Sequence, residues 1–262
     1  MRSNDVIRMI LMIRYSLIFF MGQVLTWADP ISSTSEGSDS IAKSQEKPAG
    51  NPAEKPKMLK LADGRMKYGE IEFDPKTRQV RIPCSVNMND GLLEFAVVHE
   101  NGKIHESLLI TQCSPTDINV VMKLLRYVAS EELYAIEKEP GVLTDRFPEV
   151  AEATKKAARV NLSIEWQQDG KAQKAALADW IIQAATNKPM NQEPWVYGGS
   201  MVYDGAFLAE QTGDIASIFV SRGSLLLYPG KDNFNDEAWL AHTKRMPAQG
   251  TKVHFIIQPL QP

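Results

Sequence analysis

The amino-acid sequence predicts an α+β domain, in which a mostly antiparallel β-sheet made of hairpins packs against two or three helices. Two apolar segments flank Asn101-Gly102, the dipeptide that best tolerates a tight hairpin turn. A segment with helical periodicity follows directly, at residues 114–128. From residue 160 onward, short alternating segments are separated by turns that contain glycine. With 44% hydrophobic and 23% charged residues, the 262-residue chain can bury a sizeable core.

Residues 1–28 have the pattern of a secretory signal peptide. A mostly apolar run at residues 15–25 precedes Ala28, a small residue suited to cleavage before Asp29. The positive charges of the N-terminal flank come from Arg2, Arg8 and Arg14. We therefore expect the mature protein to begin at Asp29 and to be exported, as a periplasmic or secreted protein.

A transmembrane anchor is the alternative for this segment. Arg14 splits the apolar stretch into pieces that are shorter than a membrane span, which needs about 20 residues. No membrane span is therefore expected after cleavage of the signal peptide. The start codon stays open between Met1, Met9 and Met12.

Residues 29–57 contain six serines, four prolines and no aromatic residue. Such a segment cannot bury enough apolar surface to offset the entropy lost on ordering, so we expect a disordered tether. The folded domain is expected to span residues 58–262. Its first strands are predicted at residues 59–61, 71–73 and 79–83, where apolar residues lie between turn residues or end at a proline.

The central hairpin is predicted from residues 92–99 and 103–111, joined by a type I′ turn at Asn101-Gly102. A helix is expected to follow, because Ser114 is a good N-cap and Pro115 suits the first helical position. Its apolar face consists of Ile118, Val121, Leu124, Leu125 and Val128. This face needs a cover, and the hairpin is the nearest one.

The rest of the chain predicts more strands than helices. Two prolines and a glycine in residues 138–148 indicate an irregular connection, and residues 160–167 alternate like a half-buried strand. Asp169-Gly170 predicts a tight turn before a return strand and a short helix. Further strands are expected at residues 195–203, 206–210, 215–220, 225–227 and 251–258.

Several short strings make the chain similar to the YdjY-domain family of bacterial exported proteins. They cover nearly all of residues 58–262 and are Leu93-Glu94, KIHESLL at 103–109, Asp179-Trp180-Ile181, PWVYGGS at 194–200, Gly213-Asp214-Ile215 and the segment from Gly250 to Pro259. The resemblance implies an exported domain and gives no mechanism. Some relatives are labelled ferredoxin-like, but an iron–sulfur cluster usually needs four cysteine thiolates and this chain has two. We expect no cofactor.

Those two cysteines, Cys84 and Cys113, are predicted to form a disulfide. An exported chain meets an oxidising compartment, and only one pair is available. The bridge requires that the strands ending at the two cysteines are neighbours. Two buried thiols are the alternative.

Common catalytic motifs are missing, so no catalytic residue is assigned. The sequence has no Gly-x-Ser-x-Gly elbow, no phosphate-binding Gly-x-x-x-x-Gly-Lys and no His-Glu-x-x-His. Gly198-Gly199-Ser200 could expose a nucleophile, but glycines beside a strand more often mark a bulge or close backbone approach. Trp195 and Tyr197 could line a ligand groove, or they could belong to the core. The net charge of −3 argues against a nucleic-acid partner.

The hairpin carries the candidate binding face. In the predicted register Glu94, His105 and Ser107 lie on one side of the two strands. A carboxylate, an imidazole and a hydroxyl can bind a polar ligand or support acid–base chemistry. The alternative is a hydrogen-bonded cluster that only fixes the strand register. A metal site is not expected, because His242 and His254 lie far away in sequence.

Two functions are consistent with these patterns. The first is a non-enzymatic binding or interaction module of the cell envelope, whose partner is an unknown envelope protein or cell-surface component. The second is an enzyme of unrecognised type, such as a hydrolase, that uses Glu94, His105 and Ser107. The first is favoured because catalytic motifs are missing and the domain is tethered and rich in strands. A concave site at His105 with shifted pKa values would favour the second.

Overall fold

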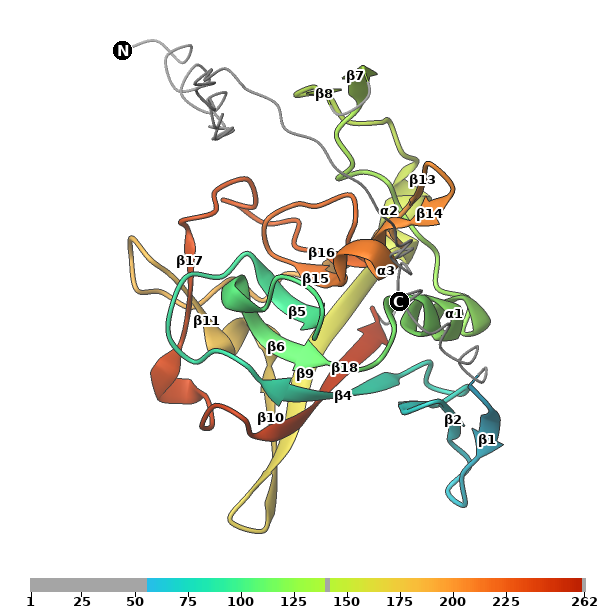
Figure 1. Ribbon diagram of the computed structural model, residues 1–262, viewed down its shortest axis with the longest axis vertical. Coiled ribbons are helices and arrows are strands. Elements are labelled where there is room, and N and C mark those ends of the chain that lie inside the picture. Colours follow the sequence, from blue (N-terminus) through green and yellow to red (C-terminus); the bar gives the residue numbers. More distant parts are fainter. Residues whose placement is uncertain (1–55, 140–141, 261–262) are drawn as a thin grey trace, which may run out of the picture. The chain divides into compact units, whose positions relative to one another are not determined.

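Eight strands pair into a closed barrel in the computed structural model of the protein (Figure 1). The structure describes residues 56–139 and 142–260. The predicted signal peptide, its cleavage site at Ala28 and Asp29, and the tether up to residue 55 lie outside the described residues. Around the barrel the strands are β4 (Val80–Val86), β18 (Lys252–Pro259), β9 (Arg159–Gln168), β12 (Trp195–Tyr197), β16 (Leu226–Leu227), β15 (Asp214–Ser217), β5 (Phe95–His99) and β6 (Ser107–Thr111). β6 pairs with β4, and this pairing closes the barrel.

The predicted α+β class is wrong, because the sheet closes on itself and does not depend on a helical layer. Only 15% of the described residues are helical. The alternation along β4 shows the physical reason, since Val80, Ile82, Cys84 and Val86 are buried while the residues between them are half-buried. A closed sheet can bury one side of every strand within its own interior.

The predicted hairpin at Asn101-Gly102 is also wrong, because β5 and β6 pair in parallel. Phe95 lies opposite Ser107 and Val98 lies opposite Ile110. The connection, residues 100–106, runs back to the start of β5 and includes the short 3-10 helix η2 (Ile104–Glu106). Neither Asn101 nor Gly102 has the positive φ that a type I′ turn requires.

The remaining strands extend the barrel or form small ribbons. β1 (Met58–Lys60), β2 (Met66–Tyr68) and β3 (Ile71–Phe73) continue antiparallel from β4. The predicted hairpin at Asp169-Gly170 is confirmed, because β10 (Lys171–Ala176) pairs antiparallel with β9. Three antiparallel ribbons pair β11 (Ile181–Gln183) with β17 (Trp239–Ala241), β13 (Val202–Tyr203) with β14 (Ala206–Phe207), and β7 (Glu137–Glu139) with β8 (Val142–Leu143).

The predicted helix is confirmed as α1 (Pro115–Leu124), and Ser114 caps it by accepting a hydrogen bond from the Asp117 amide at 3.3 Å. Its buried residues include Ile118 and Val121, whereas Leu124 is 55% exposed. The apolar face is thus narrower than predicted. The other helices are α2 (Glu152–Ala157), α3 (Leu208–Thr212), and the 3-10 turns η3 (Leu177–Trp180) and η4 (Thr243–Arg245).

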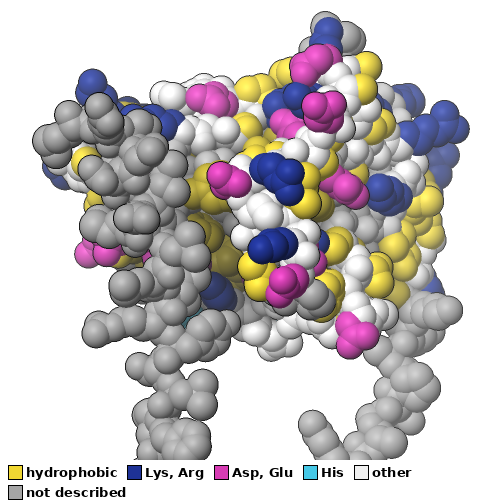
Figure 2. All heavy atoms as spheres, turned by 90° about the horizontal axis from the view of Figure 1, so that it is seen from above, with side chains coloured by type: hydrophobic (Ala, Val, Ile, Leu, Met, Phe, Trp, Pro, Cys, Tyr) yellow, Lys and Arg dark blue, Asp and Glu magenta, His cyan; other side chains and the backbone are white. Residues whose placement is uncertain are grey.

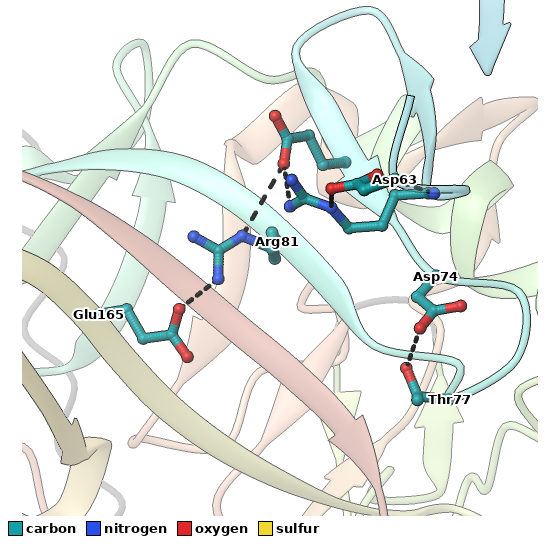
Figure 3. Close-up of polar contacts among 7 residues, drawn as sticks. Asp63, Asp74, Thr77, Arg81 and Glu165 are labelled. Carbon is teal, nitrogen blue, oxygen red and sulfur yellow. Dashed lines mark hydrogen bonds and ion pairs between the residues drawn. The ribbon is translucent and has the colours of Figure 1, made fainter. Parts of the chain in front are cut away.

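A row of alternating charges crosses neighbouring strands (Figure 3). Arg65 Nη1 lies 2.6 Å from Glu72 Oε2, and the same oxygen lies 3.9 Å from Arg81 Nε. Arg81 on β4 pairs with Glu165 on β9, and Glu165 also binds Lys174 of β10 at 3.1 Å. Because β18 lies between β4 and β9, this row helps to fix the register of three strands.

In the part of the chain that the structure describes, no helix is both long and apolar enough to cross a membrane.

Candidate functional site

The structure separates the three residues of the predicted binding face. Ser107 is fully buried at the start of β6, and its hydroxyl donates to the backbone carbonyl of Lys103 at 2.5 Å. His105 is 73% exposed in η2, with Nε2 at 3.4 Å from Glu106 Oε1. Glu94 lies just before β5 and pairs with Lys103. The parallel register explains this outcome, because the predicted face required β5 and β6 to be antiparallel.

Glu94 belongs instead to a group that we call the Asp214 cluster, defined by Glu94, Lys103, Glu106 and Asp214. Lys103 Nζ lies 3.2 Å from Glu94 Oε2 and 3.8 Å from Glu106 Oε2, and its charge also acts on Asp214. Two elements bring the group together. Lys103 and Glu106 lie in the β5–β6 connection, while Asp214 begins β15 and lies opposite Val98 of β5.

The Asp214 cluster has three carboxylates and one ammonium, and burial is the main cause of the shifted pKa values of Glu94 and Asp214. Burial raises the pKa of Glu94, and Lys103 opposes that rise. Burial likewise raises the pKa of Asp214, which is 5% exposed, although the hydrogen bond from Ser221 lowers it. Burial lowers the pKa of Lys103, but the three carboxylates outweigh it and the net shift is upward. Glu94, Lys103 and Glu106 are in contact, whereas Asp214 is linked to them only by the charge of Lys103.

Sequence reasoning missed three members of this cluster. It assigned only Glu94 to a candidate face, on a hairpin that does not form. Asp214 is brought to this region by the pairing of β15 with β5, which joins residues more than a hundred positions apart in sequence. No local pattern reports such a pairing.

A second feature is a cavity of about 520 Å³ beside β4, which we call the β4 cleft. β3 pairs with β4 opposite Arg81, and β6 pairs with β4 opposite Ser85. The cleft opens between these two pairings, where Pro83 and Cys84 face it. The cleft is also lined by Tyr68, Glu70, Ile71, Glu100, Ile110, Thr111, Gln112, Cys113, Ser114, Asp117 and Lys252.

Most polar groups of the β4 cleft are held by neighbours. The Thr111 hydroxyl donates to the Pro83 carbonyl at 2.7 Å, and this hydrogen bond gives that backbone acceptor of β4 a partner. Glu100 accepts from Gln112 at 3.0 Å, and Lys252 donates to Ser85 at 2.9 Å. These bonds give the cleft a fixed polar lining.

Both cysteines lie in the β4 cleft, and both are buried with free thiols. The strands β4 and β6 are neighbours, as the predicted bridge requires, but no Cys84–Cys113 bond is formed in the structure. The bridge therefore stays a prediction. Burial raises the pKa of both thiols, and the nearby Cys113 raises that of Cys84 further. Neither thiol is a ready nucleophile near neutral pH.

Gly198-Gly199-Ser200 has a structural role. A Cβ on Gly198 would lie 2.5 Å from both Leu227 and the Tyr134 hydroxyl, so only glycine fits. Ser200 Oγ donates to the Gly223 carbonyl at 2.6 Å and accepts from the Ala209 amide at 3.1 Å. Close backbone approach is thus confirmed as the reason for the glycine. The core alternative for Trp195 and Tyr197 is also confirmed, since these residues are 3% and 0% exposed.

Among residues 56–139 and 142–260, no three His, Cys, Asp or Glu side chains are placed to hold one metal ion.

Comparison with known proteins gives one match. The model of the family described as YdjY domain matches residues 71–258. No curated protein and no solved structure matches the chain.

Proposed function

The chain belongs to the YdjY domain family, and from that premise we propose that it is an exported, non-enzymatic binding module of the cell envelope. The β4 cleft carries this proposal. Its volume of about 520 Å³ lies in the range of small-molecule sites, and it combines apolar walls with a few fixed polar groups. Its ligand is a component of the envelope, met after the signal peptide is cleaved before Asp29.

The chemistry of the cleft supports binding over turnover. Catalysis needs a nucleophile or base within hydrogen-bond reach of a partner that activates it. Burial raises the pKa of both thiols in the cleft, and burial with the nearby Glu210 raises that of Asp117. These shifts disfavour ionisation of the two thiols, so neither is an activated nucleophile.

The alternative hydrolase receives no such support. It would need Glu94, His105 and Ser107 to meet at a substrate. The Ser107 hydroxyl is buried and bonded to a backbone carbonyl, and His105 points to solvent beside Glu106.

The charge on one face of the molecule fits a partner other than nucleic acid. Figure 2 shows positive and negative side chains interspersed over one face of the molecule, with apolar side chains between them. A nucleic-acid site would gather positive charge into one patch.

A thermal-shift screen tests the proposal. The mature protein is mixed with peptidoglycan disaccharide-peptides and with phosphatidylglycerol vesicles, and is assayed separately with chromogenic ester, phosphate and glycoside substrates. We expect at least one envelope component to raise the Tm of the wild type, since ligands that bind only the folded state stabilise it. We expect no turnover. Turnover of any substrate, or no Tm shift with either envelope component, would contradict the proposal.

Two tryptophan variants locate the binding. Ile110→Trp fills the β4 cleft and should abolish the Tm shift. Val202→Trp is the matched control, because it adds the same ring at an exposed position outside the cleft and should keep the shift. A shift that survives in Ile110→Trp would exclude the cleft as the site.

A further inference from the structure

Two carboxylates that line the β4 cleft form no ion pair with any described residue. Asp117, in the first turn of α1, accepts no hydrogen bond at its side chain from the described part of the chain, and burial and the charge of Glu210 both raise its pKa. Glu100 accepts from the neutral amide of Gln112. A cation brought to Asp117 would offset the effects that disfavour its charge.

Lys252 supplies the positive charge of the cleft lining. It donates to Ser85 Oγ at 2.9 Å and forms no ion pair with any described residue. An ammonium group has three N–H donors, so two of them stay available to a ligand. The third carboxylate of the lining, Glu70, is already paired with Lys67, whose Nζ lies 3.0 Å from Glu70 Oε2. The cleft therefore offers an acceptor and a donor whose charges are unmatched.

The two unmatched charges lie toward different ends of the cleft. Lys252 pairs in register with Ser85 of β4, at the end where β6 joins β4. Asp117 lies in α1, which contacts β3 at the other end. Ile110 faces Ser85, and the cap residue Ser114 is four residues further along, so the ends are up to about 13 Å apart along the chain.

The backbone of β4 cannot take up a ligand here as an added strand. Backbone groups alternate between the two sides of a strand, and the Pro83 carbonyl faces the cleft, where it accepts from Thr111. Pro83 has no N–H to donate. An added strand would need both a free acceptor and a donor. Recognition in the cleft therefore depends on the charged side chains and on apolar walls such as Ile71 and Ile110.

We propose that the β4 cleft binds a zwitterion of short-peptide length, whose ammonium lies at Asp117 and whose carboxylate lies at Lys252. The proposal rests on the binding role proposed for this cleft and adds the chemistry of the ligand. A three-residue peptide carries its two charges about 10 Å apart when it is extended, which is within the separation of the two ends. Capture of a free terminal amine or carboxylate is a recurring mode of peptide recognition.

Calorimetric titration of the mature protein at low ionic strength tests the proposal with four peptides that differ only in their end groups. Trialanine has both charges, N-acetyl-trialanine keeps the carboxylate, trialanine amide keeps the ammonium, and N-acetyl-trialanine amide has neither. We expect trialanine to bind and each singly blocked peptide to bind at least about tenfold more weakly, because one charge-assisted contact is lost. Failure of trialanine to bind, or a singly blocked peptide that binds as tightly as trialanine, would overturn the proposal.

Charge-removing variants assign the two contacts. Lys252→Gln should weaken trialanine about tenfold and leave trialanine amide unchanged, because that peptide has no carboxylate. Asp117→Asn should weaken trialanine about tenfold and leave N-acetyl-trialanine unchanged, because that peptide has no ammonium. Lys171→Gln and Asp236→Asn are the controls, since they remove exposed charges outside the cleft and should bind as the wild type does. Wild-type affinity for trialanine in Lys252→Gln or Asp117→Asn would contradict the assignment and the proposal with it.

These outcomes separate the chemistry of the ligand from the binding role of the cleft. If an envelope component raises the Tm of the wild type but not of Ile110→Trp, while blocking the peptide ends has no effect, the cleft is a binding site and only the zwitterion is wrong. If Ile110→Trp binds trialanine as the wild type does, the ligand lies elsewhere and both proposals fail.

Discussion

At the residue scale, Asp214 is a carboxylate whose burial opposes its ionisation. Its pKa in the folded protein is raised above the unfolded value of about 3.9. The folded state therefore binds the proton more tightly, and stability falls as the pH rises from the unfolded pKa through the folded one. Near neutral pH the ionised Asp214 destabilises the fold.

Asp214→Asn should therefore stabilise the protein near pH 7, by about 0.5 to 2 kcal/mol, as is common when a functional group is removed. The gain should shrink as the pH falls through the folded pKa and should vanish well below about 3.9, where the wild-type residue is neutral in both states. Urea unfolding of wild type, Asp214→Asn and the exposed control Asp236→Asn measures this. A variant less stable than wild type near neutral pH would show that the ionised carboxylate is needed by the fold.

Ser107 and His105 differ in burial, so their replacement should affect stability differently. Ser107 is buried and donates to the Lys103 carbonyl, so Ser107→Ala should cost about 1 to 3 kcal/mol. His105 is 73% exposed, so His105→Ala should change stability by less than about 0.5 kcal/mol. Thermal unfolding of both variants at one pH makes the comparison. A large loss of stability in His105→Ala would instead support a hydrogen-bonded polar cluster around this residue, the alternative given by the sequence.

At the element scale, the β5–β6 connection is shaped by contact between two distant glycines. The strongest local signal for a hairpin, Asn101-Gly102, is overridden because Gly102 packs against Gly213 before β15. A Cβ on Gly213 would lie 2.8 Å from Gly102 Cα, and Gly213 has a φ of 78°. Both features demand glycine.

Gly213→Ala should destabilise the protein by two effects, and Gly170→Ala separates them. Gly170 also has a positive φ, 73°, but a Cβ there would meet nothing within 4 Å. The strained φ should cost about 1 kcal/mol in each variant. Overlap with Gly102 should add about 1 to 3 kcal/mol in Gly213→Ala alone. Equal losses on urea unfolding would show that the glycine contact does not shape this connection.

The helix cap and the β9–β10 turn were predicted correctly, whereas the Asn101-Gly102 turn and the elements that depend on distant pairing were not. Ser114 and Pro115 define the start of α1, and Asp169-Gly170 defines the β9–β10 turn, because the cap and the turn depend on neighbouring residues. Residues 206–210 were predicted as a strand, yet Leu208–Thr212 is helix α3. Its Glu210 accepts hydrogen bonds from Ser114 and Thr116 at the start of α1, a tertiary contact that the sequence does not show.

At the scale of the whole molecule, closure of the barrel depends on the seam between β4 and β6. Strands with alternating burial are visible in the sequence, but the same alternation is compatible with an open sheet under helices or with a closed barrel. The choice between them is made by the parallel β5–β6 pair, which brings β6 to β4. The candidate sites could not be predicted from the sequence for the same reason, because both form where strands distant in sequence meet.

The same seam places Cys84 and Cys113 in one cleft, and the export that we propose would expose them to an oxidising compartment that joins them. The bridge would close a loop of about 30 residues and contribute about 3 to 4 kcal/mol in the chain-entropy model. Alkylation of the unfolded, unreduced protein from its native host, read by mass spectrometry, checks this. Two alkylated cysteines would reject the bridge, and protection of both would support it.

Ligand binding in the β4 cleft is most directly tested by amide chemical shifts. The mature protein is titrated with the envelope component that raises its Tm most, and shifts are followed by two-dimensional NMR. We predict saturable shifts at Ser85, Ile110 and Gln112, which line the cleft, and none at Lys171 or Ala172 at the far end of β10. The same titration of Ile110→Trp should leave the cleft amides unshifted. Saturable binding with shifts confined to residues outside the cleft would contradict the account.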